Sequence, residues 1–549
     1  MRLLWIDLNS SYTHASLALP AIHAQIPDDP MVKWTVVSAT INENIGTIVE
    51  NAARYRPDII AATTWLFNRE VLLHVISRLK TLFPAATVIL GGPEFLDKNY
   101  VFLQSHPYIN CVFRGEGEEH FPQWLQVVYD VEQWENIAGL CYFDNRGTYH
   151  DNGTAHVQQF DRLKAPESSR FFNWEKPFVQ LETARGCFNT CAFCVSGGEK
   201  PVRTLPVESI RTRLQNIAAH GIREVRILDR TFNYDAARTQ ALLALFCEFK
   251  DTLRFHVEVH PGLLTDSIKE TLRNIPSGLL HIEAGIQSLH EEVLERCERK
   301  GDFKNSLEGL TFLCHLPNVK THADLIAGLP LYRYKDIIED VHILALIGAE
   351  EIQLESLKIL PGTVMRNQAV QWGIRYAPLP PYEVLQTDDM STGELQQARR
   401  LSRLLDYYYN CPAWRRITRQ LILRECDFII RFLEYLTDCG AIEKPLSIEK
   451  RGLLLYTFCR REYPRHAESV SVAWIQAGMS LKKEPAKGIR TKGLQPPSDW
   501  RIIEGEYREN MKLCTLTGTN IQYWFGYDIR EKQGVPHMVA ITDLQKSPE

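Results

Sequence analysis

The sequence has no long apolar run. The first strand-like segment, residues 2–8, contains Asp7 where a secretion signal needs an unbroken apolar core. No other run reaches the length of about 20 apolar residues that a membrane span needs. An excess of positive charge is also missing, since 62 basic residues face 67 acidic ones for a net charge of −5. We therefore expect a cytoplasmic protein with neither a membrane nor a nucleic acid as partner.

Several binding motifs are missing as well. No GxGxxG follows the first strand-like segment and no GxxxxGK[ST] occurs, so the common nucleotide-binding loops are not indicated. The sequence has one CxxC, whereas structural zinc sites usually take four ligands in paired CxxC units. Wholesale disorder is excluded because 45% of the residues are hydrophobic.

Residues 1–135 alternate apolar segments with helix-period segments, which predicts a flavodoxin-like, doubly wound parallel sheet. The expected strands are 2–8, 33–39, 57–65, 86–92 and 110–117. Ligands of such sheets bind at the carboxyl ends of the strands. The residues expected at these ends include Ser10, Thr64, Gly91, Gly92, Gly115 and Glu116.

Residues 176–365 contain a second alternating series, which predicts a partial (β/α)6 TIM-like barrel with its chemistry at the carboxyl ends of the strands. The expected strands are 178–184, 224–230, 254–260, 279–288, 320–330 and 351–360. Between the two domains, residues 136–175 are predicted to be a linker with a hairpin around residues 145–147. Residues 366–549 are predicted to form a mainly helical accessory domain that ends in short strands.

Three of the 13 cysteines form a CxxxCxxC run, Cys187, Cys191 and Cys194, directly after the first barrel strand. A redox pair needs only two cysteines. Three thiolates on one loop can bind three irons of a [4Fe–4S] cluster. The fourth iron then has no protein ligand and is open to a small molecule.

This run, with the aromatic Phe193 before the third cysteine, resembles that of the radical S-adenosylmethionine (SAM) enzymes over residues 178–362. The resemblance implies that SAM binds the open iron and is reductively cleaved to a 5′-deoxyadenosyl radical. It also implies a cellular electron donor, flavodoxin or ferredoxin. Gln287 resembles the ribose contact of the family, and Gly328 lies in a segment that resembles the one holding the adenine. The resemblance also implies that Glu258, on the third barrel strand, is placed to face the methionine or ribose of SAM.

The sequence departs from this family at the end of the second barrel strand. The usual Gly-Gly-Glu is replaced by residues 228–231, so either Gly197–Gly198 or Asp229 is left to bind the methionine amino group. A structural ion pair remains the alternative role for Glu258, and a helix cap remains the alternative for Gln287.

A doubly wound domain before such a barrel resembles the cobalamin-binding radical SAM proteins, and the tail resembles a subgroup with an uncharacterised C-terminal domain. This implies cobalamin contacts at the six strand-end residues of the first domain. The nearest histidine, His14, is displaced by five residues from the place where a cobalt ligand is expected, so we expect cobalt without a protein histidine. A degenerate domain without cobalamin is the alternative. The similar tRNA methylthiotransferases need three cysteines in this domain, where Cys111 and Cys141 are available.

Together these features predict a cobalamin-dependent radical SAM methyltransferase that acts on an unactivated carbon of an unknown, small-molecule substrate. No catalytic residue beyond the cofactor contacts is assigned. One alternative is a radical rearrangement or cyclisation without methyl transfer. The other is a non-enzymatic sensor that uses the cluster or the corrinoid as a switch.

Overall fold

The computed structural model describes residues 1–13, 16–26, 31–491, 494, 501–502, 511–528 and 536–543, so His14 lies outside the described residues. The chain divides into two compact units. The first comprises Met1–Thr321, Gly328–Tyr332 and Ser356–Thr392. The second comprises His322–Ala327, Arg333–Glu355 and Gly393–Glu549.

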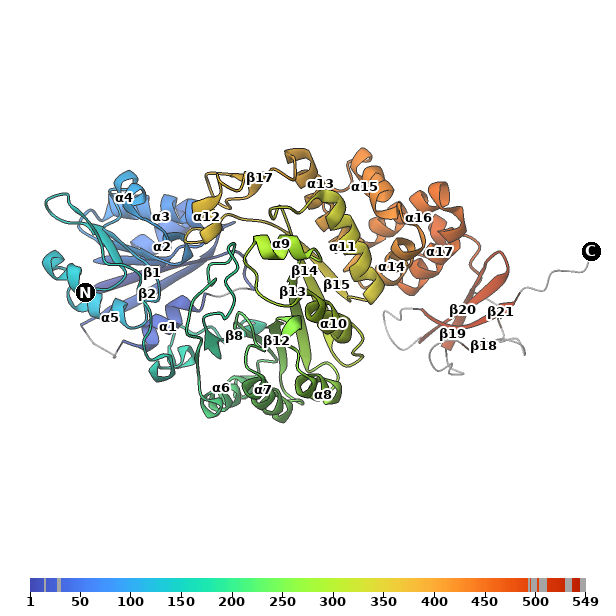
Figure 1. Cartoon of the computed structure of the whole chain (residues 1–549), viewed down its shortest axis with the longest axis horizontal. Coiled ribbons are helices and arrows are strands. Elements are labelled where there is room, and N and C mark those ends of the chain that lie inside the picture. The colour runs from blue at the N-terminus through green and yellow to red at the C-terminus, as the bar shows by residue number, and fades with distance from the viewer. Residues whose placement is uncertain are drawn as a thin grey trace, which may run out of the picture. The chain divides into compact units, whose positions relative to one another are not determined.

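A seven-stranded sheet occupies the N-terminal part of the first unit, drawn in blue to teal in Figure 1. Its order is β2-β1-β3-β4-β5-β6-β7, and its first five strands are parallel. The order 2-1-3-4-5 is that of the flavodoxin-like sheet, so this prediction is confirmed. The strands are β1 (Arg2–Asn9), β2 (Lys33–Thr40), β3 (Ile59–Thr63), β4 (Thr87–Gly91), β5 (Cys111–Phe113), β6 (Leu140–Phe143) and β7 (Tyr149–Asp151). The expected hairpin is β6–β7, and it extends this sheet antiparallel to β5.

Helices cover both faces of this sheet because successive side chains of a strand point to opposite faces. Leu4 and Ile6 of β1 pack in the core under one set of helices, whereas Leu3 and Trp5 pack in the core under the other. The first set is α2 (Ile45–Ala53), α3 (Arg69–Leu82) and α4 (Tyr100–Ser105). The second set is α1 (Ala18–Ala24) and α5 (His120–Gln126).

Six further strands follow in the chain at the places that the alternating pattern predicts. In the first unit, β8, β11, β12 and β13 lie side by side in this order and are parallel. Their bounds are β8 (Phe178–Leu181), β11 (Glu224–Ile227), β12 (Arg254–Val259) and β13 (Leu280–Gln287). The remaining two, in chain order, are β14 (Lys320–Ala327) and β15 (Glu351–Ser356).

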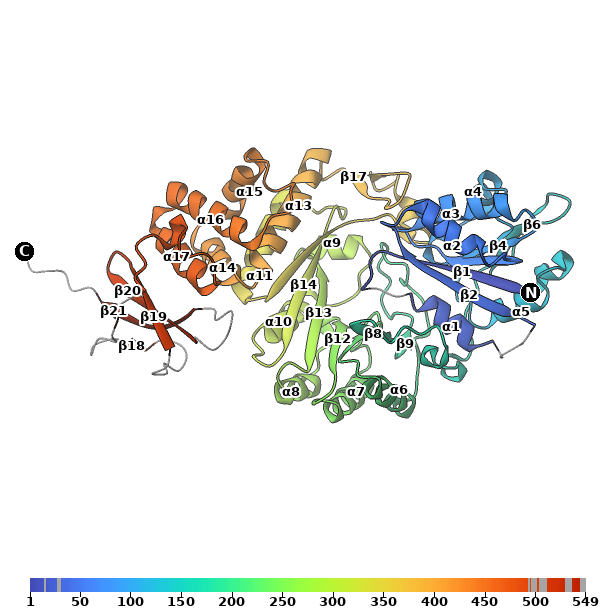
Figure 2. The same cartoon turned by 180° about the vertical axis from the view of Figure 1, so that it is seen from behind.

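Helices alternate with these strands along the chain, which agrees with the predicted partial barrel. Figure 2 shows α6, α7 and α8 next to one another along the outer side of the strands. The helices are α6 (Val207–Ala219), α7 (Ala236–Glu248), α8 (Asp266–Asn274), α9 (Glu291–Arg296), α10 (Phe303–Cys314) and α11 (Tyr334–Ile347).

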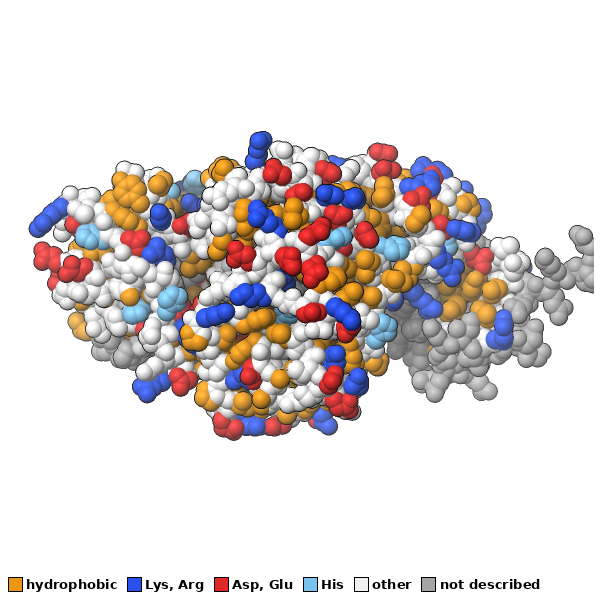
Figure 3. Space-filling view, in the orientation of Figure 1, with side chains coloured by type: hydrophobic (Ala, Val, Ile, Leu, Met, Phe, Trp, Pro, Cys, Tyr) orange, Lys and Arg blue, Asp and Glu red, His pale blue; other side chains and the backbone are white. Residues whose placement is uncertain are grey.

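Besides most of β14 and β15, the second unit contains a C-terminal part that is helical and ends in a small antiparallel sheet, as predicted for the tail. Its helices include α14 (Arg415–Arg424), α15 (Phe428–Asp438), α16 (Ile448–Glu462) and α17 (Ala467–Gln476), after α13 (Thr392–Leu404). The sheet has the order β18-β21-β20-β19, with β18 (Arg501–Ile502), β19 (Met511–Thr517), β20 (Ile521–Asp528) and β21 (His537–Asp543). Among the helices in the described part of the chain, none has both the length and the apolar character that crossing a membrane requires. On the face drawn in Figure 3, acidic and basic side chains are interspersed.

Candidate functional site

The three cysteines lie on one loop that is closed at its neck. The two-residue strands β9 (Ala184–Arg185) and β10 (Arg203–Thr204) pair antiparallel and hold the ends of the loop together. Just inside this neck, the backbone N–H of Cys187 donates to the carbonyl of Glu199 across 3.1 Å. The N–H of Cys194 donates to the carbonyl of Cys191 across 3.0 Å, which makes a turn between these two ligands.

The three thiols do not lie in the tight arrangement of a single-ion site. Thiolates around one zinc ion each lie about 2.3 Å from the metal, so their sulfurs crowd within about 4 Å of one another. In the part of the chain that the structure describes, the three Sγ atoms are not all within 4.8 Å of one another. Burial raises the pKa of the Cys191 and Cys194 thiols, Cys187 raises both further, and Cys194 also raises that of Cys191. Without metal these thiols are therefore protonated, whereas positively charged iron would favour their ionised, thiolate form.

Arg299, which the sequence analysis missed, links the loop to the end of β13. One guanidinium N–H donates to Sγ of Cys191 across 3.6 Å, and another donates to the carbonyl of Gly285. Gln287 follows on the same strand in the left-handed region, at φ 71°. A Cβ on Gly285 would come within 2.7 Å of the Gln287 amide nitrogen, so the glycine makes room for that side chain. The strand end predicted to contact SAM is therefore held beside a predicted cluster ligand.

Asp229 anchors the segment that leads into the loop. Its carboxylate accepts the N–H groups of Thr183 and Ala184 across 2.7 and 2.8 Å and also the Thr183 hydroxyl. Burial raises the pKa of Asp229 to about 6, although these donors and the charge of Arg238 lower it. The carboxylate is occupied by the protein itself, which disfavours Asp229 as the contact to the SAM amino group. Gly197 and Gly198 remain the other candidates.

Glu258 lies near the cluster loop without a bonded partner. In the described structure its carboxylate makes neither a hydrogen bond nor an ion pair, so the alternative of a structural ion pair is not found. Burial and the charges of Glu283 and Asp229 raise the pKa of Glu258, Arg230 opposes them, and the net value is about 7. Its charge also raises the pKa of Cys194. Phe193 is half-buried on the loop, and Gly328 follows β14 at φ 92°.

The predicted cobalamin edge has a buried hydroxyl beside a crowded glycine. The Thr64 side chain is fully buried, and its Oγ1 has no hydrogen-bond partner among the described residues. Gly92 has φ 107°, and a Cβ there would lie 2.5 Å from the Thr64 carbonyl oxygen. The N–H of Thr64 donates to the carbonyl of Gly91 across 2.6 Å. Ser10 is half-buried at the end of β1. This edge of the sheet thus combines a hydroxyl without a described partner with glycines, which have no side chain. Both features are compatible with a large ligand that comes close to the backbone.

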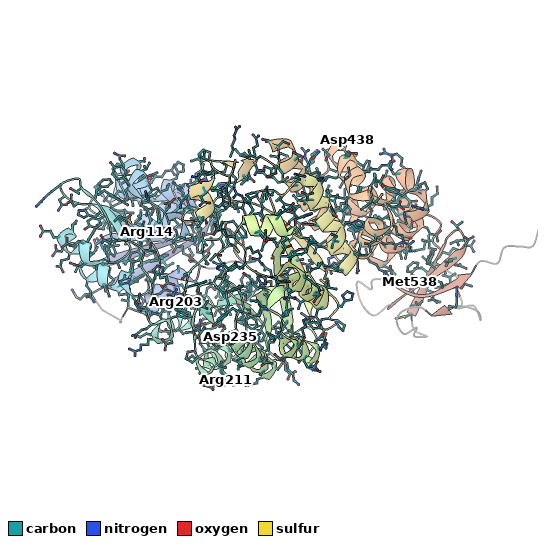
Figure 4. The ribbon with its side chains drawn as sticks, in the orientation of Figure 1. Arg114, Arg203, Arg211, Asp235, Asp438 and Met538 are labelled. Carbon is teal, nitrogen blue, oxygen red and sulfur yellow. The ribbon has the colours of Figure 1, made fainter. Side chains whose placement is uncertain are left out.

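Gly115 and Glu116 follow β5 at the same edge. Gly115 has φ 100° and packs so closely on Ala155 that a Cβ would lie 2.2 Å from its carbonyl oxygen. Glu116 was predicted to contact cobalamin, but its carboxylate instead accepts two N–H groups of Arg203 across 2.7 and 2.9 Å and one of Arg185 across 3.4 Å. Arg203 is labelled in Figure 4, between the N-terminal sheet and the first barrel elements. A cobalamin contact by Glu116 is therefore disfavoured, because the carboxylate already binds the neck of the cysteine loop.

A second contact joins the edge to residues 357–384, another feature that the sequence analysis missed. Glu94, next to the β4 glycines, accepts the Tyr382 hydroxyl across 2.6 Å and an N–H of Arg69 across 3.0 Å. The guanidinium of Arg366 lies 4.6 Å from the centre of the Tyr382 ring. The main chain joins the same segment to the cluster loop, since the N–H of Met365 donates to the carbonyl of Ala192 across 2.8 Å. This segment thus contacts both predicted cofactor sites.

Comparison with known families agrees with this architecture. Residues 6–125 match the B12 binding domain, residues 181–344 match the Radical SAM superfamily, and residues 370–475 match a protein of unknown function, DUF4080. The chain therefore contains a radical SAM barrel preceded by a B12 binding domain. It belongs to the cobalamin-binding radical SAM proteins, in a group that carries DUF4080 after the barrel. These domains imply a [4Fe–4S] cluster, SAM and cobalamin, which confirms the three predicted cofactors.

Individual relatives are distant. The cobalamin-dependent radical SAM methyltransferase TokK of Streptomyces tokunonensis is 24% identical over 63% of this chain and 52% of its own length. The tRNA-2-methylthio-N(6)-dimethylallyladenosine synthase of Vesicomyosocius okutanii is 22% identical over 52% of this chain and 63% of its own length. This chain thus spans about half of TokK. The cobalamin-dependent SAM radical enzyme OxsB, solved with aqua-cobalamin and SAM, shares the fold at a TM-score of 0.59, with 14% identity over 86% of this chain and 78% of OxsB.

Proposed function

We propose that this protein transfers a methyl group from SAM to an unactivated carbon of a small molecule, with a [4Fe–4S] cluster and cobalamin as cofactors. The observation that supports this best is the direct bonding between the two sites. Within one compact unit, Arg185 and Arg203 at the neck of the cysteine loop bind Glu116 at the strand-end edge of the B12 domain. A corrinoid at that edge would lie next to SAM bound at the loop.

The residues divide into groups with different roles in this proposal. Cys187, Cys191 and Cys194 would hold the cluster. The SAM contacts would be Phe193, Glu258, Gln287 and Gly328, and the cobalamin contacts would be Ser10, Thr64, Gly91, Gly92 and Gly115. When bound, the cluster and SAM supply a 5′-deoxyadenosyl radical, and cobalamin supplies the methyl group. The protein orients these groups and excludes water around them.

Domain boundaries and partners belong to the same proposal. The division is 1–135 for the B12 domain, 136–175 for a linker whose first part adds the β6–β7 hairpin to the sheet, 176–365 for the barrel and 366–549 for the accessory region. A flavodoxin or ferredoxin would deliver the electron.

The products of SAM distinguish the proposal from its alternatives. The full chain would be reconstituted anaerobically with iron, sulfide and hydroxocobalamin and incubated with SAM and a strong reductant. We expect both 5′-deoxyadenosine and S-adenosylhomocysteine by mass spectrometry. Formation of 5′-deoxyadenosine alone would favour rearrangement or cyclisation, and uncleaved SAM would favour the sensor.

A further inference from the structure

The neck of the cysteine loop pairs two arginines. In the β9–β10 ladder, Arg185 lies directly opposite Arg203. Like charges at directly opposed positions of an antiparallel pair repel each other. Each strand of this ladder has only two residues, so its backbone pairing alone gives little stability. Closure of the neck therefore depends on anions from outside the ladder.

Four carboxylates supply this negative charge. Glu182 and Glu118 bind Arg185 across 2.7 and 2.6 Å, and Glu199 binds Arg203 across 2.6 Å. Glu116 is the one that binds both arginines. Both guanidinium groups are mostly buried, with side-chain exposures of 13% and 15%. Water can therefore screen their mutual repulsion only weakly.

The loop that carries Glu116 has little freedom to move. Gly115 is packed on the backbone of Ala155, and a Cβ on Gly117 would lie 3.2 Å from the Ile22 side chain. The backbone N–H of Glu116 donates to the Ala155 carbonyl across 2.9 Å. Burial raises the pKa of Glu116, but the bonds from Arg203 and the charge of Arg185 outweigh it, so the pKa is lowered overall and the carboxylate stays ionised.

We propose that Glu116 is a positioning residue through which the B12 domain holds the cluster-binding loop of the barrel closed. The inference rests on the proposed function only in taking Cys187, Cys191 and Cys194 as cluster ligands. Glu116 is the one of the four carboxylates that both arginines share, and it is presented by the loop that also forms the predicted cobalamin edge. Glu116 thus ties the two cofactor sites through both arginines, and disturbing it loosens the cluster loop without touching a cysteine ligand.

Hydrogen exchange of the full chain without cofactors tests this directly. Glu116→Gln keeps the size and shape of the side chain but removes the negative charge that the two arginines share. We expect backbone amides of residues 185–204, among them the Cys187 N–H, to exchange about tenfold faster than in the unaltered protein. Glu119→Gln is the matched control, because Glu119 is also half-buried on this loop but, among the described residues, its carboxylate accepts only the N–H groups of Gln158 and Gln159, across 3.3 and 3.5 Å. Equal exchange in Glu116→Gln and Glu119→Gln would overturn the proposal.

Two further measurements separate neck opening from general unfolding. Arg203→Gln removes the other partner of the same ion pair, on the barrel side. Because both substitutions disrupt one interaction, the neck amides of the double variant should exchange no faster than those of the more affected single variant. Additive effects, or faster exchange throughout the chain, would contradict the proposal. After reconstitution, a chelator should remove iron from Glu116→Gln about tenfold faster. Hydrogen exchange at the neck is measured without a cluster. The test of Glu116 therefore remains valid even if the protein has no radical activity.

Discussion

Arg299 donates a hydrogen bond to Sγ of Cys191 across 3.6 Å, from a position 108 residues further along the chain. The positive charge and the hydrogen bond both lower the pKa of this thiol against the effect of burial. The same guanidinium holds the carbonyl of Gly285, so one side chain connects a predicted cluster ligand with the strand end predicted to bind SAM. Arg299 is therefore placed to influence the electron affinity of a cluster at this loop.

Arg299→Gln should make the cluster harder to reduce. A hydrogen bond from a cation stabilises the more negative, reduced state, so its loss should lower the midpoint potential by about 40 mV, equivalent to about 1 kcal/mol. Redox titration followed by electron paramagnetic resonance measures this shift. Arg296→Gln serves as control, because that guanidinium lies 4.6 Å from the Trp372 ring, and it makes no described bond to a cysteine. Equal potentials in both variants would contradict the assignment.

Alanine at any of Cys187, Cys191 or Cys194 should abolish the cluster. The unaltered chain should retain about four iron atoms after reconstitution, and each variant should retain almost none. Cys297→Ala is the matched control. Its thiol is buried near Cys191, and burial raises its pKa to about 12, so Cys297 remains protonated at neutral pH. If Cys297→Ala lost its iron, or if an alanine variant of Cys187, Cys191 or Cys194 retained it, the assignment of these three cysteines as the cluster ligands would be refuted.

The strands and the cysteine loop could be predicted because both depend on local sequence. The alternation of apolar segments with helix-period segments indicates which side chains are buried, and so where strands and helices lie. The order β2-β1-β3-β4-β5 is the one that the flavodoxin-like pattern implies. Three cysteines within eight residues need no knowledge of the fold to share a loop.

The contacts between segments could not be predicted in this way. Glu116 and Arg203 are 87 residues apart, and Glu94 and Tyr382 are 288 apart, so only the folded chain shows that they meet. The glycines around Glu116 suggested a ligand site, and nothing local indicated that two arginines occupy its carboxylate. Asp229 was ambiguous for the same reason, because its donors, Thr183 and Ala184, belong to another strand end.

Asp229→Asn should change the pH dependence of stability. The pKa of Asp229 is raised by burial from an ordinary value of 3.8 to about 6, so the folded protein holds this proton more tightly than the unfolded chain does. The stabilising effect is complete below pH 3.8 and is lost as the pH rises through 6. The amide does not ionise. Between pH 4 and pH 7.5, its free energy of unfolding should therefore rise relative to the unaltered protein by about 2 kcal/mol. Denaturant unfolding at several pH values measures this, and a difference independent of pH would be the contrary result.

Thr64→Val should separate stability from cobalamin binding. The Thr64 hydroxyl is buried without a described partner, so a methyl group in its place should stabilise the protein without cofactor by about 1 kcal/mol. If this hydroxyl binds the corrinoid, the same change should weaken hydroxocobalamin binding about tenfold, because a hydrogen bond is worth roughly that much. Thr418→Val is the matched control, since the Thr418 hydroxyl in α14 is also buried without a described partner but belongs to the second unit. Both variants should unfold at higher temperature, and only Thr64→Val should show weaker binding in an absorbance titration. Equal cobalamin affinity in the two variants would remove Thr64 from the site.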